Sequence, residues 1–160
     1  MATAHTNLSA FNPEEVPSGK GLRIAVVVAE WNQQITENLF QGAEEALLAC
    51  GVSKDNILRT NVPGSFELVF GAKKALEKGA DAVIVIGSVI QGETKHFDFV
   101  CQGVTQGIVQ LNLSANAPVI FCVLTDNTLQ QAIDRSGGQH GNKGVEAAVT
   151  ALKMVALAKS

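Results

Sequence analysis

The sequence predicts an α/β protein in which helices cover both faces of a four-stranded parallel sheet, giving a three-layer α/β/α sandwich. Two observations support this fold class. Short β-branched runs alternate with longer segments that carry apolar residues at helical spacing. One of the short runs is almost continuously apolar, which is typical of a strand covered on both faces. Alternating strands and helices form parallel sheets with right-handed crossovers.

The chain divides into an N-terminal arm and one α/β domain. Residues 1–21 are polar, hold two of the four prolines and show no sustained periodicity, so they predict an arm outside the core. Residues 22–160 predict a single domain. A chain of 160 residues can bury roughly 68–70% of the surface that its unfolded form exposes, which is enough for a substantial core.

The predicted elements follow one another without a long interruption. The strands are rich in β-branched and other apolar residues and cover residues 22–30, 56–62, 81–90 and 117–125. The helices show apolar residues at helical spacing and cover residues 35–50, 65–79, 96–113, 129–136 and 142–159. Ser65 could cap the second helix, and Gly51 and Gly79 are expected to end the first two. The sheet has two edges, and we expect the arm or another subunit to cover one.

Composition and charge argue against several classes of protein. The formal net charge is −3 and only 17% of residues are charged, so no basic patch for nucleic acid is predicted. The start of the chain lacks the regions of a signal peptide, and no apolar run approaches the ~18 residues of a membrane helix. Cys50, Cys101 and Cys122 are widely spaced among apolar residues, which favours reduced core thiols. We therefore expect a soluble, cytoplasmic protein.

Ligands of an open parallel sheet bind beyond the carboxyl ends of its strands, which directs attention to the loops there. The loop after the first strand holds Trp31, the only tryptophan, followed by Asn32. The Trp31 ring could stack on a planar heterocycle, and the Asn32 amide supplies both a donor and an acceptor. The alternative for Trp31 is a core or interface position, which composition alone favours.

The loop after the second strand holds Ser65, Phe66 and Glu67 at the expected start of a helix. The helix dipole favours a carboxylate there, and the Glu67 carboxylate could also accept hydrogen bonds from ligand hydroxyls. Helix capping by Ser65 and Glu67 is the alternative, and these residues alone favour it. Asp and Glu residues elsewhere show no metal-ligand spacing, so no metal is predicted.

The loop after the third strand, GSVIQGETKHFDF at residues 87–99, is the most informative. Its two glycines have the G-x-x-x-x-G spacing of a nucleotide loop, but Glu93 stands where that motif requires lysine. The backbone N–H groups of Gly92, Glu93 and Thr94 lead into a helix and could still hold a phosphate. His96 could transfer protons beside that phosphate, although a lone histidine is more often an ordinary polar residue.

The last segment contributes an aromatic ring and two cations. Phe121 is expected near the end of the fourth strand, and Arg135 and Lys143 follow it. Arg135 could bind phosphate through two hydrogen bonds and Lys143 could act as a second cation, or both could belong to a solvated helix face and a Gly-rich turn. The G-x-S-x-G, H-E-x-x-H, C-x-x-C and G-x-G-x-x-G motifs are absent from the sequence. These residues predict a pocket for a planar ring and a phosphate, but not the reaction.

Five segments in this order and spacing resemble the lumazine synthase family: AEWN, VPGSFE, GSVIQGETKHFD, PVIFCVLT and QAIDRSGGQHGNKG. The resemblance covers about residues 22–158 and implies a flavodoxin-like fold in which residues 22–160 form the catalytic domain. It implies condensation of 5-amino-6-(ribitylamino)uracil with 3,4-dihydroxy-2-butanone 4-phosphate to 6,7-dimethyl-8-ribityllumazine, phosphate and water. It implies no organic cofactor and no metal.

The resemblance also assigns roles by matching motif positions. His96 would transfer protons, and Arg135 would be both a catalytic residue and the cationic partner of the phosphate. The phosphate loop would consist of Gly92, Glu93 and Thr94. The substrate-binding residues would be Trp31 and Asn32 at the pyrimidine, Ser65, Phe66 and Glu67 at the ribityl chain, the backbone of Val89, Ile90 and Gln91 at the pyrimidine edge, and Phe121 and Lys143.

The resemblance further implies a homopentamer with active sites between adjacent subunits, so that Phe121, Arg135 and Lys143 would come from the neighbour. The family's N-terminal segment adds to a neighbour's sheet. The short connection between Arg135 and Lys143 is typical of members that assemble into sixty-subunit icosahedral shells, with a free pentamer as the alternative and a riboflavin synthase as a candidate enclosed partner. A non-catalytic flavin-binding module and a purely shell-forming protein are the alternatives to an enzyme.

Two positions depart from the family pattern. Trp31 stands where many members have phenylalanine, and its larger face is expected to bind riboflavin or product more tightly. Gln139 replaces a common lysine between Arg135 and Lys143, which changes the local charge but leaves both proposed cations in place.

Overall fold

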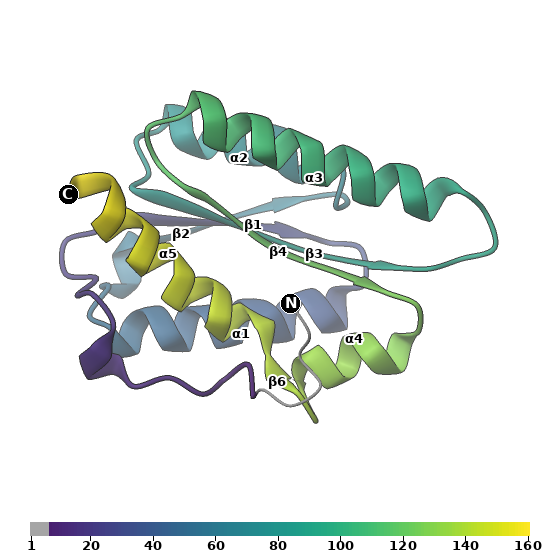
Figure 1. Ribbon diagram of the computed structural model, residues 1–160, viewed down its shortest axis with the longest axis horizontal. Helices are drawn as coiled ribbons and strands as arrows, with labels where there is room; N and C mark the ends of the chain where they lie inside the picture. Colours follow the sequence, from purple (N-terminus) through teal and green to yellow (C-terminus); the bar gives the residue numbers. More distant parts are fainter. Residues whose placement is uncertain (1–6) are drawn as a thin grey trace.

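The sheet lies between two layers of helices, as Figure 1 shows for a computed structural model that describes residues 7–160. Its four strands are parallel and lie in the order β2-β1-β3-β4. This confirms the predicted three-layer, flavodoxin-like α/β fold. The strands are β1 (Ile24–Ala29), β2 (Ile57–Val62), β3 (Ala82–Ile90) and β4 (Val119–Asp126). The helices are α1 (Gln33–Ala49), α2 (Leu68–Glu77), α3 (His96–Ser114), α4 (Leu129–Arg135) and α5 (Lys143–Lys159).

The two central strands are buried on both faces because their side chains alternate between two cores. Val26 and Ile84 belong to the core on the α1 and α5 side, whereas Val27 and Val85 belong to the core on the α2 and α3 side. All six residues of β1 are buried. Only the last two residues of β3 are half-buried, at the end where the strand leaves the sheet. Burial of both faces of these strands therefore explains the continuous apolar runs in the sequence, as predicted.

The predicted helix ends are confirmed, but the predicted cap of α2 is wrong. Gly51 and Gly79 follow α1 and α2 with φ of 91° and 78°, a left-handed conformation that suits glycine. Ser65 does not cap α2, because Phe66 and Glu67 separate it from Leu68, where the helix begins. The Ser65 side chain points towards β3 instead, where a Cβ added at Gly87 would lie 2.6 Å from Ser65 Oγ.

The end of the chain differs from expectation in two details. Phe121 is the third residue of β4, which continues to Asp126, so the prediction that the strand ends near Phe121 is wrong. The expected Gly-rich turn forms a small antiparallel pair, β5 (Ser136–Gly138) with β6 (Gly141–Asn142). Glycine allows this tight reversal, since Gly137 and Gly141 have φ of 114° and 83°.

The described part of the N-terminal arm, residues 7–21, runs along the α1 and α5 side of its own chain (Figure 1). Leu8 N–H donates to the His140 carbonyl over 2.8 Å, and Asn142 N–H donates to Ser9 Oγ over 2.9 Å. Leu8 is buried. The first six residues of the expected arm lie outside the described residues. Strands β2 and β4 form the two edges of the sheet.

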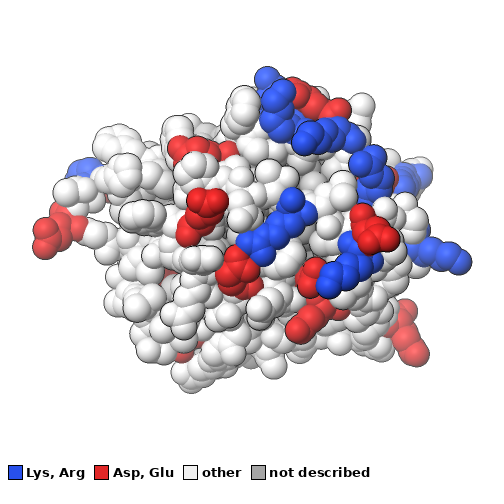
Figure 2. Space-filling view, turned by 180° about the vertical axis from the view of Figure 1, so that it is seen from behind, with Lys and Arg blue, Asp and Glu red and all other residues white. Residues whose placement is uncertain are grey.

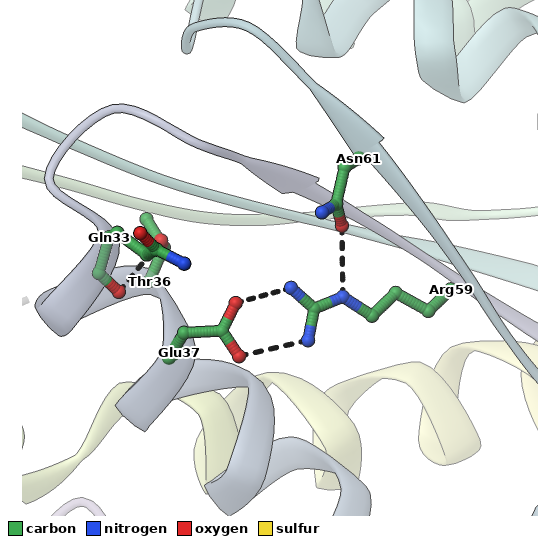
Figure 3. A network of polar contacts seen from close by, with 5 residues as sticks. All are labelled: Gln33, Thr36, Glu37, Arg59 and Asn61. Carbon is green, nitrogen blue, oxygen red and sulfur yellow. Dashed lines mark hydrogen bonds and ion pairs between the residues drawn. The ribbon is translucent and has the colours of Figure 1, made fainter.

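A charged pair joins α1 to the edge strand β2 near the strand-end loops (Figure 3). Two N–H groups of the Arg59 guanidinium donate to the two carboxylate oxygens of Glu37, one of them over 2.9 Å. Arg59 Nε donates to Asn61 Oδ1 over 2.9 Å, and the guanidinium lies 4.4 Å from the centre of the Phe40 ring. The hydrogen bond from Arg59 lowers the pKa of the Glu37 carboxyl.

The surface and the cysteines also bear on the sequence-based expectations. On the face in Figure 2, Lys and Arg side chains lie among Asp and Glu side chains. Within residues 7–160, none of the helices combines the length and apolar character needed to cross a membrane.

Cys50 and Cys122 are buried free thiols, as predicted, whereas Cys101 is half-buried. Burial raises the pKa of Cys122 to about 12.

Candidate functional site

A cavity of about 730 Å³ lies at the carboxyl ends of the strands, where the loops after β1, β2 and β3 meet. The sequence predicts a site at this end of the sheet. Most of the predicted pocket residues line it, and so do several residues that were not predicted. The lining residues are Trp31, Asn32, Pro63, Gly64, Ser65, Phe66, Glu67, Ser88, Val89, Ile90, Gly92, Thr94, His96, Phe97, Phe99 and Val100.

The first loop presents an aromatic face to the cavity. The Trp31 side chain is 74% exposed, so it is not a core residue of this subunit. Its backbone N–H donates to the Pro63 carbonyl over 3.2 Å, which brings the first two loops together. Asn32 adopts a left-handed conformation, with φ of 57° and ψ of 47°, and this tight turn takes the chain from β1 into α1. Trp31 is therefore held at the rim of the cavity with its ring free.

The second loop combines a buried hydroxyl, an exposed ring and a carboxylate. Ser65 is 5% exposed, whereas Phe66 is 58% exposed. A Cβ added at Gly103 of α3 would lie 2.7 Å from the Phe66 ring, which shows how closely the ring rests on that helix. A Cβ at Gly64 would lie 3.0 Å from Glu67 Oε2, so the Glu67 carboxylate folds back over the loop. The loop therefore provides both a hydrogen-bond donor and a hydrogen-bond acceptor, which a polar ligand chain requires.

The third loop places a histidine at the first turn of a long helix. Val89 and Ile90 emerge half-buried from the sheet, and the backbone at Gly92 has open space around its Cα. His96 is the first residue of α3 and is exposed. Its backbone N–H donates to Thr94 Oγ1 over 3.4 Å, which fixes the turn before the helix. The N-terminal end of α3 therefore opens into the cavity, and an anion there would be favoured by the helix dipole.

Two buried hydroxyls in the cavity wall have no hydrogen-bond partner among the described residues. Ser65 Oγ and Ser88 Oγ are both in this state, and Ser88 is 1% exposed. Buried polar atoms normally have a hydrogen-bond partner. These two hydroxyls therefore mark places where a polar group of a ligand would form a hydrogen bond. Ser88 was not predicted from the sequence. A lone serine in an otherwise apolar strand was the signal that could have identified it.

Five residues named from the sequence do not line this cavity. Gln91 and Glu93 are exposed neighbours of the lining residues in the third loop. The remaining three lie elsewhere in the same subunit. Phe121 packs against the core on the α2 and α3 side, Arg135 Nη1 donates to the Gln131 carbonyl over 3.1 Å, and Lys143 Nζ lies 2.8 Å from both carboxylate oxygens of Glu146.

The apolar part of the wall was also underestimated from the sequence. Phe97, Phe99 and Val100, from the first turns of α3, line the cavity beside Val89 and Ile90. Phe99 is 69% exposed. Within residues 7–160 no cluster of three or more His, Cys, Asp or Glu side chains is arranged to hold a metal ion. The site thus offers aromatic faces, buried hydroxyls, a carboxylate, a helix N-terminus and an imidazole.

Known proteins resemble this chain over almost its whole length. The sequence pattern of the 6,7-dimethyl-8-ribityllumazine synthase family matches residues 21–159. A 6,7-dimethyl-8-ribityllumazine synthase of Flavobacterium johnsoniae is 63% identical over 155 residues, which cover 96% of this chain and 82% of the relative. Proteins of the same name from Christiangramia forsetii and Porphyromonas gingivalis are 57% and 58% identical, and the matches cover 99% and 98% of this chain and 96% and 98% of the relatives.

Proposed function

The chain belongs to the 6,7-dimethyl-8-ribityllumazine synthase family, transferases of riboflavin biosynthesis, and on this premise we propose that the strand-end cavity is its active site. There, 5-amino-6-(ribitylamino)uracil would condense with 3,4-dihydroxy-2-butanone 4-phosphate. The observation that carries the proposal is the convergence of Trp31, Glu67 and His96 on one cavity from three successive strand-end loops. A sequence resemblance alone does not require these side chains to line the same cavity.

The pyrimidine would lie on the exposed face of Trp31. Stacking of aromatic rings contributes about 0.5–1.5 kcal/mol beyond the area buried, and the exposed indole is free to provide it. Asn32 would sit beside the ring, although its side-chain amide already donates to the Ser88 carbonyl over 2.9 Å. The backbone of Val89, Ile90 and Gln91 would then supply hydrogen bonds to the edge of the pyrimidine, because the pairing of β3 with β1 ends at Ile86 and no described strand pairs with that edge of β3 beyond it.

The ribityl chain would lie along the second loop. Its hydroxyls are both donors and acceptors, and the loop offers the Ser65 hydroxyl and the Glu67 carboxylate. Ser65 Oγ is buried and has no partner among the described residues, so a substrate hydroxyl would restore a hydrogen bond that burial otherwise removes. Phe66 would cover the apolar side of the chain.

The phosphate of the second substrate would sit at the start of α3. The backbone N–H groups of Gly92, Glu93 and Thr94 precede the helix, and the partial positive charge of its N-terminus attracts an anion. The loop has no lysine at the position where a nucleotide-binding loop has one. The cationic partner would therefore be Arg135, whose planar guanidinium suits bidentate contact with phosphate.

His96 would move protons during the reaction. The substrate amine attacks the ketone and water leaves to give an imine; phosphate is then eliminated, and the resulting enol tautomerises and closes the ring with loss of a second water. General acid–base catalysis contributes about 10²–10⁴-fold, whereas holding two substrates in a reactive geometry contributes about 7–11 kcal/mol. Positioning therefore provides most of the acceleration, and His96 adds to it. No cofactor and no metal are required for these steps.

A complete site would need a second subunit. Phe121, Arg135 and Lys143 lie outside the cavity of their own chain, so their proposed contacts with substrate would be made across an interface. We infer a homopentamer with the active sites between adjacent subunits, and a sixty-subunit shell built from such pentamers in the cytoplasm. An N-terminal arm added to a neighbour's edge strand and an enclosed riboflavin synthase belong to the same proposal.

The direct test is to mix the two substrates with the protein and to record the absorbance of the lumazine and the release of phosphate together. Equal amounts of product and phosphate are expected, and omission of either substrate should abolish both. A protein that binds riboflavin but yields neither product would be a non-catalytic flavin-binding member. Particles without affinity for either substrate would instead indicate a purely shell-forming protein.

A further inference from the structure

The described start of the N-terminal arm lies beside the β5–β6 hairpin of its own chain, which directly follows Arg135 (Figure 1). Leu8 N–H donates to the His140 carbonyl over 2.8 Å, and His140 N–H donates to the Asp134 carbonyl over 2.8 Å. Asp134 directly precedes Arg135 at the end of α4. Two hydrogen bonds, both made by the main chain of His140, therefore connect the arm to the last turn of α4.

The next arm residue holds the second strand of the hairpin. Asn142 N–H donates to Ser9 Oγ over 2.9 Å. A Cβ added at Gly141 would lie 2.8 Å from Ser9 N, so the backbones of the arm and of β6 are in close contact. Leu8 is 6% exposed, and burial of its apolar side chain favours the docked arm. The arm thus holds both the connection and the second strand of the hairpin.

The first strand of the hairpin has little apolar anchorage of its own. β5 has the sequence Ser-Gly-Gly and offers the core no large apolar side chain. A cavity of about 710 Å³ lies between β5, α1 and the arm. Strand β6 has a further anchor, because Asn142 Nδ2 donates to the Asn38 carbonyl of α1 over 2.7 Å. Loss of the arm contacts is therefore expected to free the Arg135 side of the hairpin more than the β6 side.

We propose that Leu8 and Ser9 are positioning residues for the phosphate site, because they hold the hairpin in the arrangement that places Arg135 against the phosphate of the butanone substrate. This inference rests on the proposed function, in which Arg135 of one subunit completes the site of its neighbour. A binding group that is in place for only a fraction of the time weakens the apparent affinity by that fraction. The arm contacts raise this fraction and tighten phosphate binding without touching the substrate.

Leu8→Ala weakens the docking of the arm by removing most of its buried side chain. The readouts are the inhibition constant of inorganic phosphate and KM for the butanone phosphate, both followed by lumazine absorbance. Both constants should rise roughly two- to tenfold, because the hairpin loses support comparable to one hydrogen bond. The matched control is Val16→Ala, which shortens a half-buried apolar side chain elsewhere in the arm and should leave both constants within about twofold of the parent.

Ser9→Ala removes only the oxygen that accepts from Asn142 N–H. It should raise the same constants by a smaller factor than Leu8→Ala, because β6 keeps its anchor on α1. Ser9→Thr retains the hydroxyl and should restore the parent values. The matched control is Ser18→Ala, whose hydroxyl also accepts a backbone N–H, from Lys20 over 3.3 Å, but near the other end of the arm. Equal effects of Ser9→Ala and Ser9→Thr would contradict the inference.

A positioning role at the phosphate site predicts a selective effect. KM for the pyrimidine substrate and the quenching of Trp31 by riboflavin should stay close to the parent values in Leu8→Ala, because both report on the loops after β1, β2 and β3. Sedimentation should show the assembly of the parent. Equal weakening of both substrates, or loss of the assembly, would mean that the arm supports the whole fold, and would overturn the inference.

A double-mutant cycle separates this inference from the proposed function. Arg135→Ala should raise the inhibition constant of inorganic phosphate, and adding Leu8→Ala in that background should change it no further. If Arg135→Ala has no effect, the assignment of Arg135 fails and the inference fails with it. If Arg135→Ala raises the constant but Leu8→Ala does not, only the inference is wrong. An effect of Leu8→Ala that persists without Arg135 would also overturn it.

Discussion

The side-chain amide of Asn32 donates a hydrogen bond to the carbonyl oxygen of Ser88 over 2.9 Å and joins the loop after β1 to the end of β3. Asn32 is also the only non-glycine residue with a positive φ among residues 7–160. Asparagine tolerates this left-handed conformation, which costs most other L residues about 1–2 kcal/mol. One residue therefore fixes both the turn into α1 and the spacing of two cavity walls.

The two contributions of Asn32 can be separated by substitution. Asn32→Gly keeps the left-handed turn and removes the hydrogen bond, whereas Asn32→Ala loses the bond and strains the turn. The alanine variant should be less stable than the glycine variant by about 1 kcal/mol in urea unfolding. Both should show weaker binding of the pyrimidine substrate. Equal stability of the two variants would mean that the backbone conformation at this position carries no strain.

Trp31 provides an intrinsic probe of the cavity, because it is the only tryptophan and is 74% exposed. Titration with riboflavin should quench its fluorescence if the flavin stacks on the indole. Trp31→Phe keeps a smaller ring and should weaken riboflavin binding several-fold, in line with about 0.5–1.5 kcal/mol for an aromatic pair. Riboflavin binding seen by calorimetry without quenching would place the flavin elsewhere.

The Glu37–Arg59 pair should make stability depend on pH in the acid range. The pKa of Glu37 is lowered in the folded protein, so the pair stabilises the fold above the ordinary glutamate pKa, and this contribution is lost as the pH falls through the lowered value. Both side chains are about one third exposed, so the contribution is about 0.2–1 kcal/mol. The difference in unfolding free energy between the parent and Glu37→Gln should shrink from pH 7 to pH 3. A constant difference would argue against the pair.

The crossing of α1 and α5 depends on a glycine. A Cβ added at Gly144 would lie 1.9 Å from the Leu39 carbonyl oxygen, a distance that no rotamer change can relieve. Gly144→Ala should therefore force the two helices apart and lower the free energy of unfolding by about 1–3 kcal/mol. Gly92→Ala is the control, because no atom lies within 4 Å of the added Cβ, and it should stay within about 0.5 kcal/mol of the parent.

The sequence was sufficient for the fold because hydrophobic periodicity and glycine positions determine it. Strands β1 and β3 were recognisable as apolar runs, and Gly51 and Gly79 marked the helix ends. The errors occur where local chemistry is ambiguous. Ser65 has the residue type of a cap but points towards β3, and the glycines between α4 and α5 permit a short strand pair as readily as a turn.

The candidate site was predictable for a related reason. The carboxyl ends of parallel strands lie at one end of the sheet, so the loops that follow β1, β2 and β3 lie close together. Trp31, Glu67 and His96 belong to these loops and line the same cavity. Ser88 was missed because a strand residue was read only as part of the core. The predicted contacts of Phe121 and Lys143 depend on how copies of the chain associate, which the periodicity of one chain does not encode.

The central claim is that His96 transfers protons in a cavity whose main contribution is to position two substrates. Its direct test is kcat for His96→Ala at saturating concentrations of both substrates, with His140→Ala, on the β5–β6 connection, as the matched control. We expect a fall of about 10²-fold or more for His96→Ala, with residual lumazine formation above the uncatalysed rate, and little change for His140→Ala. An unchanged kcat for His96→Ala would contradict it.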